Sequence, residues 1–234
     1  MPDAPPPCNL HPELVAFKYG LRHLTRSFAR QRKIKVVAIG SSSTAGESGI
    51  IPYPCRLQMV LRNRYPDRMI DVLNRGISGQ EAPEELSRFE PDVIGEAPAL
   101  VIWQVGTNAI YHRDQYDPHR VAGSIATGLG LLSGLEMDVI LMDLQYAPVL
   151  LTKEKKADTE LMVSLISAAA ETAEVNLFPR FALMKQWQDG DKIPPATLIN
   201  ADGLHQTEWS TNCVTQALDS AIGAAVGTVP AAPA

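Results

Sequence analysis

The run IKVVAIGSSSTAG (residues 34–46) joins six mostly apolar residues to a turn that contains three serines between two glycines. The β-branched residues favour a strand over 34–39, and Gly40 ends it. The turn has three alternative interpretations: a plain helix cap, an anion-binding loop, or a turn that carries a serine nucleophile. A P-loop carries a lysine that residues 40–47 lack, which disfavours phosphate binding.

Apolar runs of alternating type surround this stretch on its C-terminal side. The pattern predicts further strands at 69–74, 99–105, 138–144 and 175–178, and helical segments at 54–65, 83–96, 118–135, 154–173, 179–188 and 207–226, with a loop over 189–204. Strands that alternate with helices pair in parallel, and helices cover both faces of the sheet. We therefore expect a three-layer α/β/α sandwich with a flavodoxin-like five-stranded parallel sheet, in the order 2-1-3-4-5.

The chain divides into one domain with two short ends. Residues 1–33 are predicted to form an N-terminal arm, whose basic stretch from Arg22 to Lys35 is expected to be a solvated surface segment. Residues 34–227 are expected to form a single catalytic domain, and residues 228–234 a flexible tail.

Composition excludes several classes of function. The 234 residues carry a net charge of −5, whereas a nucleic-acid-binding protein is expected to present a basic face. No apolar run approaches the roughly 20 residues that a transmembrane helix needs. The opening MPDAPPPCNL lacks the features of a signal peptide, and its prolines and Cys8 favour an exported mature chain over a cytosolic protein.

The three cysteines lack the spacing of metal ligands, so we predict no metal and no cofactor. Cys55 lies within a helical pattern and is expected to be a small buried residue. For Cys8 and Cys213 two interpretations remain open, namely two further buried thiols or a disulfide that ties down the N-terminal arm.

Polar residues follow the predicted strands at the edge of the sheet where ligands bind in such folds. GSSSTAG follows the first strand, NRGISG (74–79) the second and GTN (106–108) the third, while DGLH (202–205) precedes the last helix. Each motif alone is weak, because glycine, asparagine and aspartate are common in turns and helix caps. Together they supply a serine, backbone N–H donors, a side-chain amide and an acid–histidine pair.

These four blocks resemble those of the SGNH, or GDSL, hydrolase superfamily. The family's Gly-Asp-Ser-x-Thr-x-Gly block corresponds to residues 40–46, which makes Ser42 the nucleophile and puts Ser41 where the family has aspartate. The second block's glycine falls on Gly76 and the third block's asparagine on Asn108. The last block places its acid and base on Asp202 and His205. The third block usually continues with aspartate, and this chain has Ala109 there.

The resemblance implies a serine esterase acting on an acyl or acetyl ester. Ser42, His205 and Asp202 would form the triad, and the Ser42 N–H, the Gly76 N–H and the Asn108 amide would bind the oxyanion. The same site also suits acyl transfer to a sugar or another alcohol, and a non-catalytic carbohydrate- or lipid-binding module is a further alternative. The expected ligand is a small-molecule, carbohydrate or lipid ester.

Other side chains near these blocks are weaker candidates. We expect residues after the fourth strand, and one close to Asn108, to line the substrate pocket: Gln145, Tyr146, Pro148 and Tyr111. Trp103 lies within a strand pattern and is expected in the core. Trp209, one turn into the last helix, is expected to pack behind His205.

Overall fold

A five-stranded parallel sheet forms the centre of the computed structural model, which describes residues 5–47 and 49–227. Its strand order, β2-β1-β3-β4-β5, confirms the predicted topology. The strands are β1 (Lys33–Gly40), β2 (Met69–Gly76), β3 (Leu100–Gln104), β4 (Asp138–Met142) and β5 (Asn176–Phe178). All five residues of β3 are buried, as expected for a strand that helices cover on both faces.

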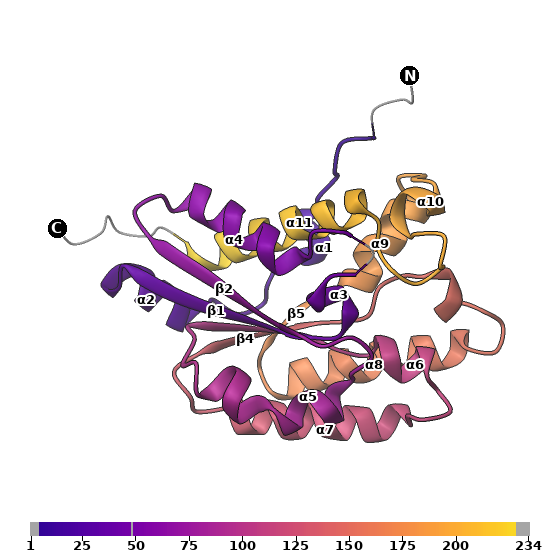
Figure 1. The fold of residues 1–234 in the computed structure, drawn as a ribbon, viewed down its shortest axis with the longest axis horizontal. Coiled ribbons are helices and arrows are strands. Elements are labelled where there is room, and N and C mark those ends of the chain that lie inside the picture. The colour runs from indigo at the N-terminus through magenta and orange to yellow at the C-terminus, as the bar shows by residue number, and fades with distance from the viewer. Residues whose placement is uncertain (1–4, 48, 228–234) are drawn as a thin grey trace.

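Helices form the two outer layers of the sandwich (Figure 1). One layer contains α1 (Pro12–Val15), α4 (Tyr53–Arg64), α9 (Arg180–Asp189) and α11 (Glu208–Val226). The other contains α5 (Ala82–Ser87), η1 (Glu90–Ile94), α7 (Pro118–Leu132) and α8 (Lys156–Thr172). The segment over 189–204, expected to be a loop, also includes the single helical turn α10 (Pro195–Leu198).

The basic segment near the N-terminus packs on the core, which corrects the expectation of a wholly solvated segment. Residues Arg22–Arg30 form helix α2, whose arginines are exposed while Leu24 and Phe28 are fully buried. These two apolar residues lie four positions apart and therefore share one face of the helix. The domain boundary after residue 33 stays a prediction, and the predicted tail at 228–234 lies outside the described residues.

A disulfide between Cys8 and Cys213 joins the N-terminal arm to helix α11, with the two Cα atoms 5.4 Å apart. Two tryptophans hold the same arm, since Trp187 Nε1 donates to the Asn9 carbonyl and Trp209 Nε1 to the Pro6 carbonyl. Trp209 also packs edge-on against Trp187. Its recorded partners are thus the arm and helix α9, whereas we expected it to pack behind His205.

Cys55 is exposed, so the expectation that it is buried is wrong. The buried residues of helix α4 include Leu57 and Leu61, which are four positions apart on one face. Cys55 precedes Leu57 by two positions, or about 200° around the helix, and so projects toward solvent. Within the described residues, no helix has both the length and the apolar character that a membrane span requires.

Helix α7 is continuous although three glycines weaken its sequence pattern. At Gly128 a Cβ atom would lie 2.7 Å from Cζ3 of Trp103, so only glycine lets the helix approach the indole. The Trp103 ring, fully buried, packs edge-on against Phe89 with the ring centroids 4.7 Å apart. Trp103 is therefore a core residue, as predicted.

A buried carboxyl group lies beneath this aromatic pair. Glu85 Oε2 accepts a hydrogen bond of 2.7 Å from Trp103 Nε1, while Oε1 has no recorded hydrogen-bond partner in the described structure. Burial, together with the charge of nearby Glu81, raises the pKa of Glu85 well above its ordinary 4.5. The folded protein therefore favours the protonated form of Glu85.

This arrangement predicts how stability depends on pH. Because the folded pKa of Glu85 is raised, its contribution is fully present below about pH 4.5 and is lost as the pH rises through the folded pKa. We expect the free energy of unfolding in urea to fall as the pH rises above about 4.5, and to fall less in Glu85→Gln. An equal fall in both proteins would contradict this account of Glu85.

Candidate active site

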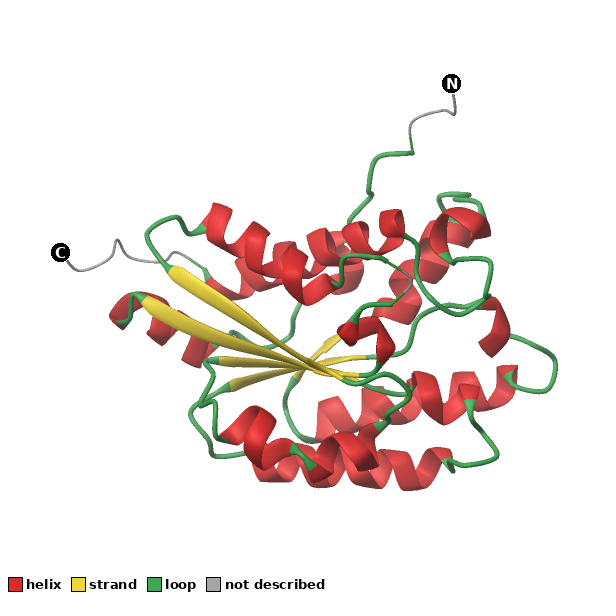
Figure 2. Cartoon of the chain, viewed as in Figure 1, coloured by secondary structure: helices red, strands yellow, loops and turns green. Residues whose placement is uncertain are grey.

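The predicted site lies at the carboxyl ends of the strands, where helix α3 (Ser42–Ala45) follows β1 directly (Figures 1 and 2). Ser42 is the first residue of this single helical turn and is 7% exposed. The N–H groups of Thr44 and Ala45 donate to the Ser41 carbonyl, which closes the turn. The sharp change from strand to helix thus presents the Ser42 side chain at the edge of the sheet.

Gln104, the last residue of β3, holds this turn. Its Oε1 accepts hydrogen bonds from the Ser41 N–H and the Ser41 hydroxyl, both at 3.1 Å, and from the Thr44 hydroxyl at 3.2 Å. Gly40 makes the contact possible, because a Cβ atom there would lie 2.9 Å from the same oxygen. Ser41, which replaces the aspartate of the resembled motif, is therefore anchored by a neutral side-chain amide.

The acid–histidine pair lies on a closed loop that precedes helix α11. Ile199 and Gln206 form an antiparallel bridge, and the Asn200 N–H donates to the His205 carbonyl at 2.8 Å. Gly203, at φ 74°, adopts the left-handed conformation that the tight turn requires. This bridge brings Asp202 and His205 to the edge of the sheet where Ser42 lies.

The structure brings Ser42, His205 and Asp202 into one hydrogen-bonded chain. His205 Nε2 lies 3.0 Å from Ser42 Oγ, and His205 Nδ1 lies 2.7 Å from Asp202 Oδ2. A carboxylate can only accept, so Nδ1 carries the proton and Nε2 accepts from the Ser42 hydroxyl. Although partial burial opposes ionisation, hydrogen bonds from the Leu204 N–H and from the His205 ring and N–H lower the pKa of Asp202.

Asn108 lies in helix α6 (Thr107–Tyr111), directly after β3, and is 4% exposed. Its Nδ2 donates to the Gln80 carbonyl at 2.7 Å, which leaves the second N–H of the same amide group for another acceptor. Buried Glu81 supports this segment by accepting from the Gly106 N–H and the Ala109 N–H, both at 2.8 Å. Glu81, at the start of α5, therefore holds the backbone of the block in which Ala109 replaces the usual aspartate.

Gly76 ends strand β2 beside the turn that follows β1. Its N–H donates to Asn74 Oδ1 at 2.9 Å, and a Cβ atom there would lie 2.7 Å from the Thr44 carbonyl carbon. The glycine is thus required for the close approach of α3 to β2. Gly79, in the following turn at φ 81°, has no recorded acceptor for its N–H among the described residues.

Gln145, one of the predicted pocket residues, is fully buried and connects three loops of the site. Its Oε1 accepts from Thr107 Oγ1 at 2.9 Å and from Ser43 Oγ at 3.4 Å, and its Nε2 donates to the Leu204 carbonyl at 3.3 Å. Buried Arg180 donates to the same Oε1 at 2.9 Å. The Gln145 side chain therefore links the segments that carry Ser42, Asn108 and His205.

The remaining predicted pocket residues lie near the margins of the site. Tyr146 packs edge-on against Phe181, and Tyr111 is 39% exposed beside Lys155. Pro148 begins the short helix η2 (Pro148–Leu150), where the Val149 N–H donates to the Gly203 carbonyl of the histidine loop. A substrate-binding role for these residues stays a prediction.

A small cavity of about 20 Å³ adjoins Ser42 and His205. The other residues that line it come from α3 and the loop after it, and from the histidine loop and the start of α11: Ser43, Gly46, Glu47, Ile50, Pro52, Gln206 and Thr211. Gln145, Tyr146, Pro148 and Tyr111 are not among its lining residues. Glu47 was not singled out in the sequence, where it reads as an ordinary loop carboxylate.

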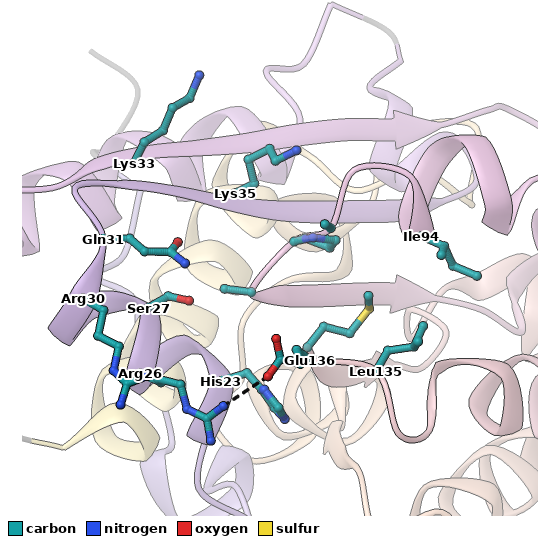
Figure 3. A pocket seen from close by; sticks show the side chains of 14 residues that line it. His23, Arg26, Ser27, Arg30, Gln31, Lys33, Lys35, Ile94, Leu135 and Glu136 are labelled. Atoms are coloured by element: carbon teal, nitrogen blue, oxygen red, sulfur yellow. Dashed lines mark hydrogen bonds and ion pairs between the residues drawn. The ribbon is translucent and has the colours of Figure 1, made fainter.

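A larger hollow of about 710 Å³ lies at the opposite end of the sheet, near the start of β1 (Figure 3). Lys33 and Lys35 extend from β1, and Arg26 and Arg30 from α2. Arg26 is paired with Glu136 at 3.4 Å, and Lys35 with Glu96 at 3.2 Å. None of the predicted catalytic or oxyanion residues lines this hollow.

Solved structures of an acetylxylan esterase and of an α/β hydrolase share this fold. Acetylxylan esterase Axe2 from Geobacillus stearothermophilus is 19% identical with a TM-score of 0.70, over 83% of this chain and 94% of that chain. LAE5, an α/β hydrolase from the metagenome of Lake Arreo, Spain, is 21% identical with a TM-score of 0.68, over 81% of this chain and 96% of that chain. Three catalytic mutants of Axe2 that also match replace a serine, an aspartate or a histidine with alanine. At these identities the likeness establishes the fold.

The amino-acid sequence matches a family model, although it matches no individual curated protein. A family model described as the Non-GDSL lipase-like family matches residues 7–228. This description departs from the GDSL label of the resemblance, and the chain departs from the GDSL motif at Ser41. The chain belongs to the Non-GDSL lipase-like family.

Proposed function

We propose that this protein is a serine esterase that hydrolyses acetyl or other short acyl esters through Ser42, His205 and Asp202. The observation that carries the proposal is the continuous pair of hydrogen bonds from Ser42 Oγ through the His205 ring to Asp202. The lipase-like family supports it, as do the esterases that share the fold and the serine, aspartate and histidine replaced in the Axe2 catalytic mutants.

In the first half-reaction, Ser42 Oγ attacks the ester carbonyl while its proton passes to His205 Nε2. Asp202 holds the ring in the required tautomer and stabilises the imidazolium that forms. The Ser42 N–H and the free N–H of the Asn108 amide donate to the developing oxyanion. The predicted third donor is Gly76, whose N–H would have to be shared with Asn74. The N–H of Gly79, in the turn after β2, has no acceptor among the described residues.

The tetrahedral intermediate then collapses to an acyl-enzyme. The bond from the carbonyl carbon to the alcohol oxygen breaks, and the proton on Nε2 passes to that oxygen, so a neutral alcohol leaves. In the second half-reaction, water gives a proton to Nε2 and attacks the acyl-Ser42 carbonyl. The bond from the carbonyl carbon to Ser42 Oγ then breaks, the proton on Nε2 returns to Oγ, and the acid leaves. The His205 side chain is 21% exposed, so water can reach Nε2 for this half-reaction.

Two further features bear on the substrate and on the location of the protein. The cavity beside Ser42 is small, which favours acetyl and other short acyl groups over long chains. The Cys8–Cys213 disulfide is typical of proteins in oxidising compartments and supports the proposed export of the mature chain.

Replacement of the nucleophile tests the proposal directly. We expect Ser42→Ala to lower kcat for nitrophenyl acetate by at least about 10⁴-fold, because no other group on the turn is hydrogen-bonded to His205 Nε2. Ser43→Ala is the matched control and should lower kcat far less, since Ser43 makes only a long hydrogen bond to Gln145. Full turnover by Ser42→Ala would overturn the assignment, and a larger loss in Ser43→Ala would move the nucleophile to Ser43.

The oxyanion role of Asn108 makes a separate prediction. We expect Asn108→Ala to lower kcat by about 10²–10³-fold with a smaller change in KM, because an oxyanion donor acts mainly in the transition state. The free energy of unfolding, measured in urea, separates this effect from loss of the hydrogen bond to Gln80. An unchanged kcat would remove Asn108 from the oxyanion hole.

A further inference from the structure

Glu47 is a second carboxylate beside the histidine of the proposed triad. Its Oε2 lies 3.2 Å from His205 Nε2, the nitrogen that also faces Ser42 Oγ. The Ser78 hydroxyl donates to Glu47 Oε1 and so ties the side chain to the loop after β2. The Glu47 side chain is 33% exposed, which leaves it accessible to a ligand at the mouth of the site.

Glu47 and His205 together present two hydrogen-bond acceptors. In the resting tautomer, the ring proton is on Nδ1 and is donated to Asp202, so Nε2 carries a lone pair. The Glu47 carboxylate has only lone pairs as well. The Ser42 hydroxyl donates to Nε2, so no protein proton is left between Nε2 and Glu47 Oε2, and a donor group of a ligand would satisfy the carboxylate.

The leaving alcohol of an ester passes through this position. When the bond from the carbonyl carbon to the alcohol oxygen breaks, that oxygen takes the proton from His205 Nε2. In a sugar or another polyol, a hydroxyl on the next carbon lies beside this oxygen, at a separation similar to that of Nε2 and Oε2. Glu47 and His205 both line the small cavity beside Ser42.

We propose that Glu47 accepts a hydrogen bond from the hydroxyl next to the ester in the leaving alcohol, and so selects partly acylated polyols and sugars as substrates. The proton of that hydroxyl stays on its oxygen throughout, and the reaction itself remains the acyl transfer to Ser42. This inference rests on the proposed esterase function. If Glu47 were only a counter-ion of the imidazolium, it would affect all esters alike.

The test compares 2-hydroxyethyl acetate with 2-methoxyethyl acetate, in which a methyl group replaces the hydroxyl hydrogen. For the wild-type protein we expect kcat/KM to be about tenfold or more higher for the hydroxyl ester, as expected for a hydrogen bond to a charged acceptor. In Glu47→Ala the ratio should fall to about one. Glu47→Gln keeps a neutral oxygen acceptor and should give an intermediate ratio.

Two control variants separate recognition by Glu47 from general effects of charge or folding. Glu160→Gln removes an exposed carboxylate on helix α8 and should keep the wild-type ratio. Ser78→Ala keeps the Glu47 carboxylate but removes its anchor, so the ratio should fall only partly. Thermal unfolding of each variant checks that the fold is retained.

The outcomes distinguish the inference from the function on which it rests. A wild-type ratio of one, a full ratio in Glu47→Ala, or an equal loss on both esters in Glu47→Ala would overturn the role of Glu47 while leaving the esterase intact. Failure of the wild-type protein to hydrolyse either ester, or nitrophenyl acetate, would instead overturn the proposed function.

Discussion

The side-chain oxygen of Gln104 is the constraint on which the proposed nucleophile depends. It accepts three hydrogen bonds from the turn that follows β1, and it lies on the neighbouring strand β3. The parallel register of β1 and β3 fixes where Gln104 lies. The hydrogen bonds that Gln104 accepts from the turn then fix the position of Ser42. A buried donor left without its acceptor costs free energy, so the turn has one strongly preferred position. A displacement of about 1 Å in such a group is enough to lower a rate about a hundredfold.

Elsewhere in the site, other buried side chains also hold the loops that carry the reacting groups. Gln145, which follows β4, contacts the serine, asparagine and histidine loops at once, and Glu81 holds the backbone around Asn108. The two positions at which the chain departs from the resembled motifs, Ser41 and Ala109, are thus braced by Gln104 and Glu81. Function is proposed for the exposed edge of this network, where Ser42, His205 and Glu47 meet.

The local sequence pattern was sufficient to predict the sheet and the four motifs. It could not show contacts between residues that are distant in the sequence. Apolar β-branched runs bounded by turns predicted the five strands, and their alternation with helices predicted the order. The sequence pattern places Gln104 within an apolar strand, and a single polar residue there does not reveal what its side chain contacts. The two apolar residues of α2, Leu24 and Phe28, were obscured by the three arginines of the same helix. The pairing of Cys8 with Cys213 joins residues 205 positions apart, and sequence spacing alone could not choose it over two buried thiols.

The most direct test of the account is the rate at which a fluorophosphonate probe modifies Ser42, mapped by mass spectrometry in the wild-type protein and in Gln104→Leu. The account predicts that the wild-type protein is modified at Ser42 and at neither Ser41 nor Ser43. It also predicts that folded Gln104→Leu reacts about a hundredfold more slowly, because the turn has lost its anchor. Modification at Ser41 or Ser43, or an equal rate in the two proteins, would contradict it.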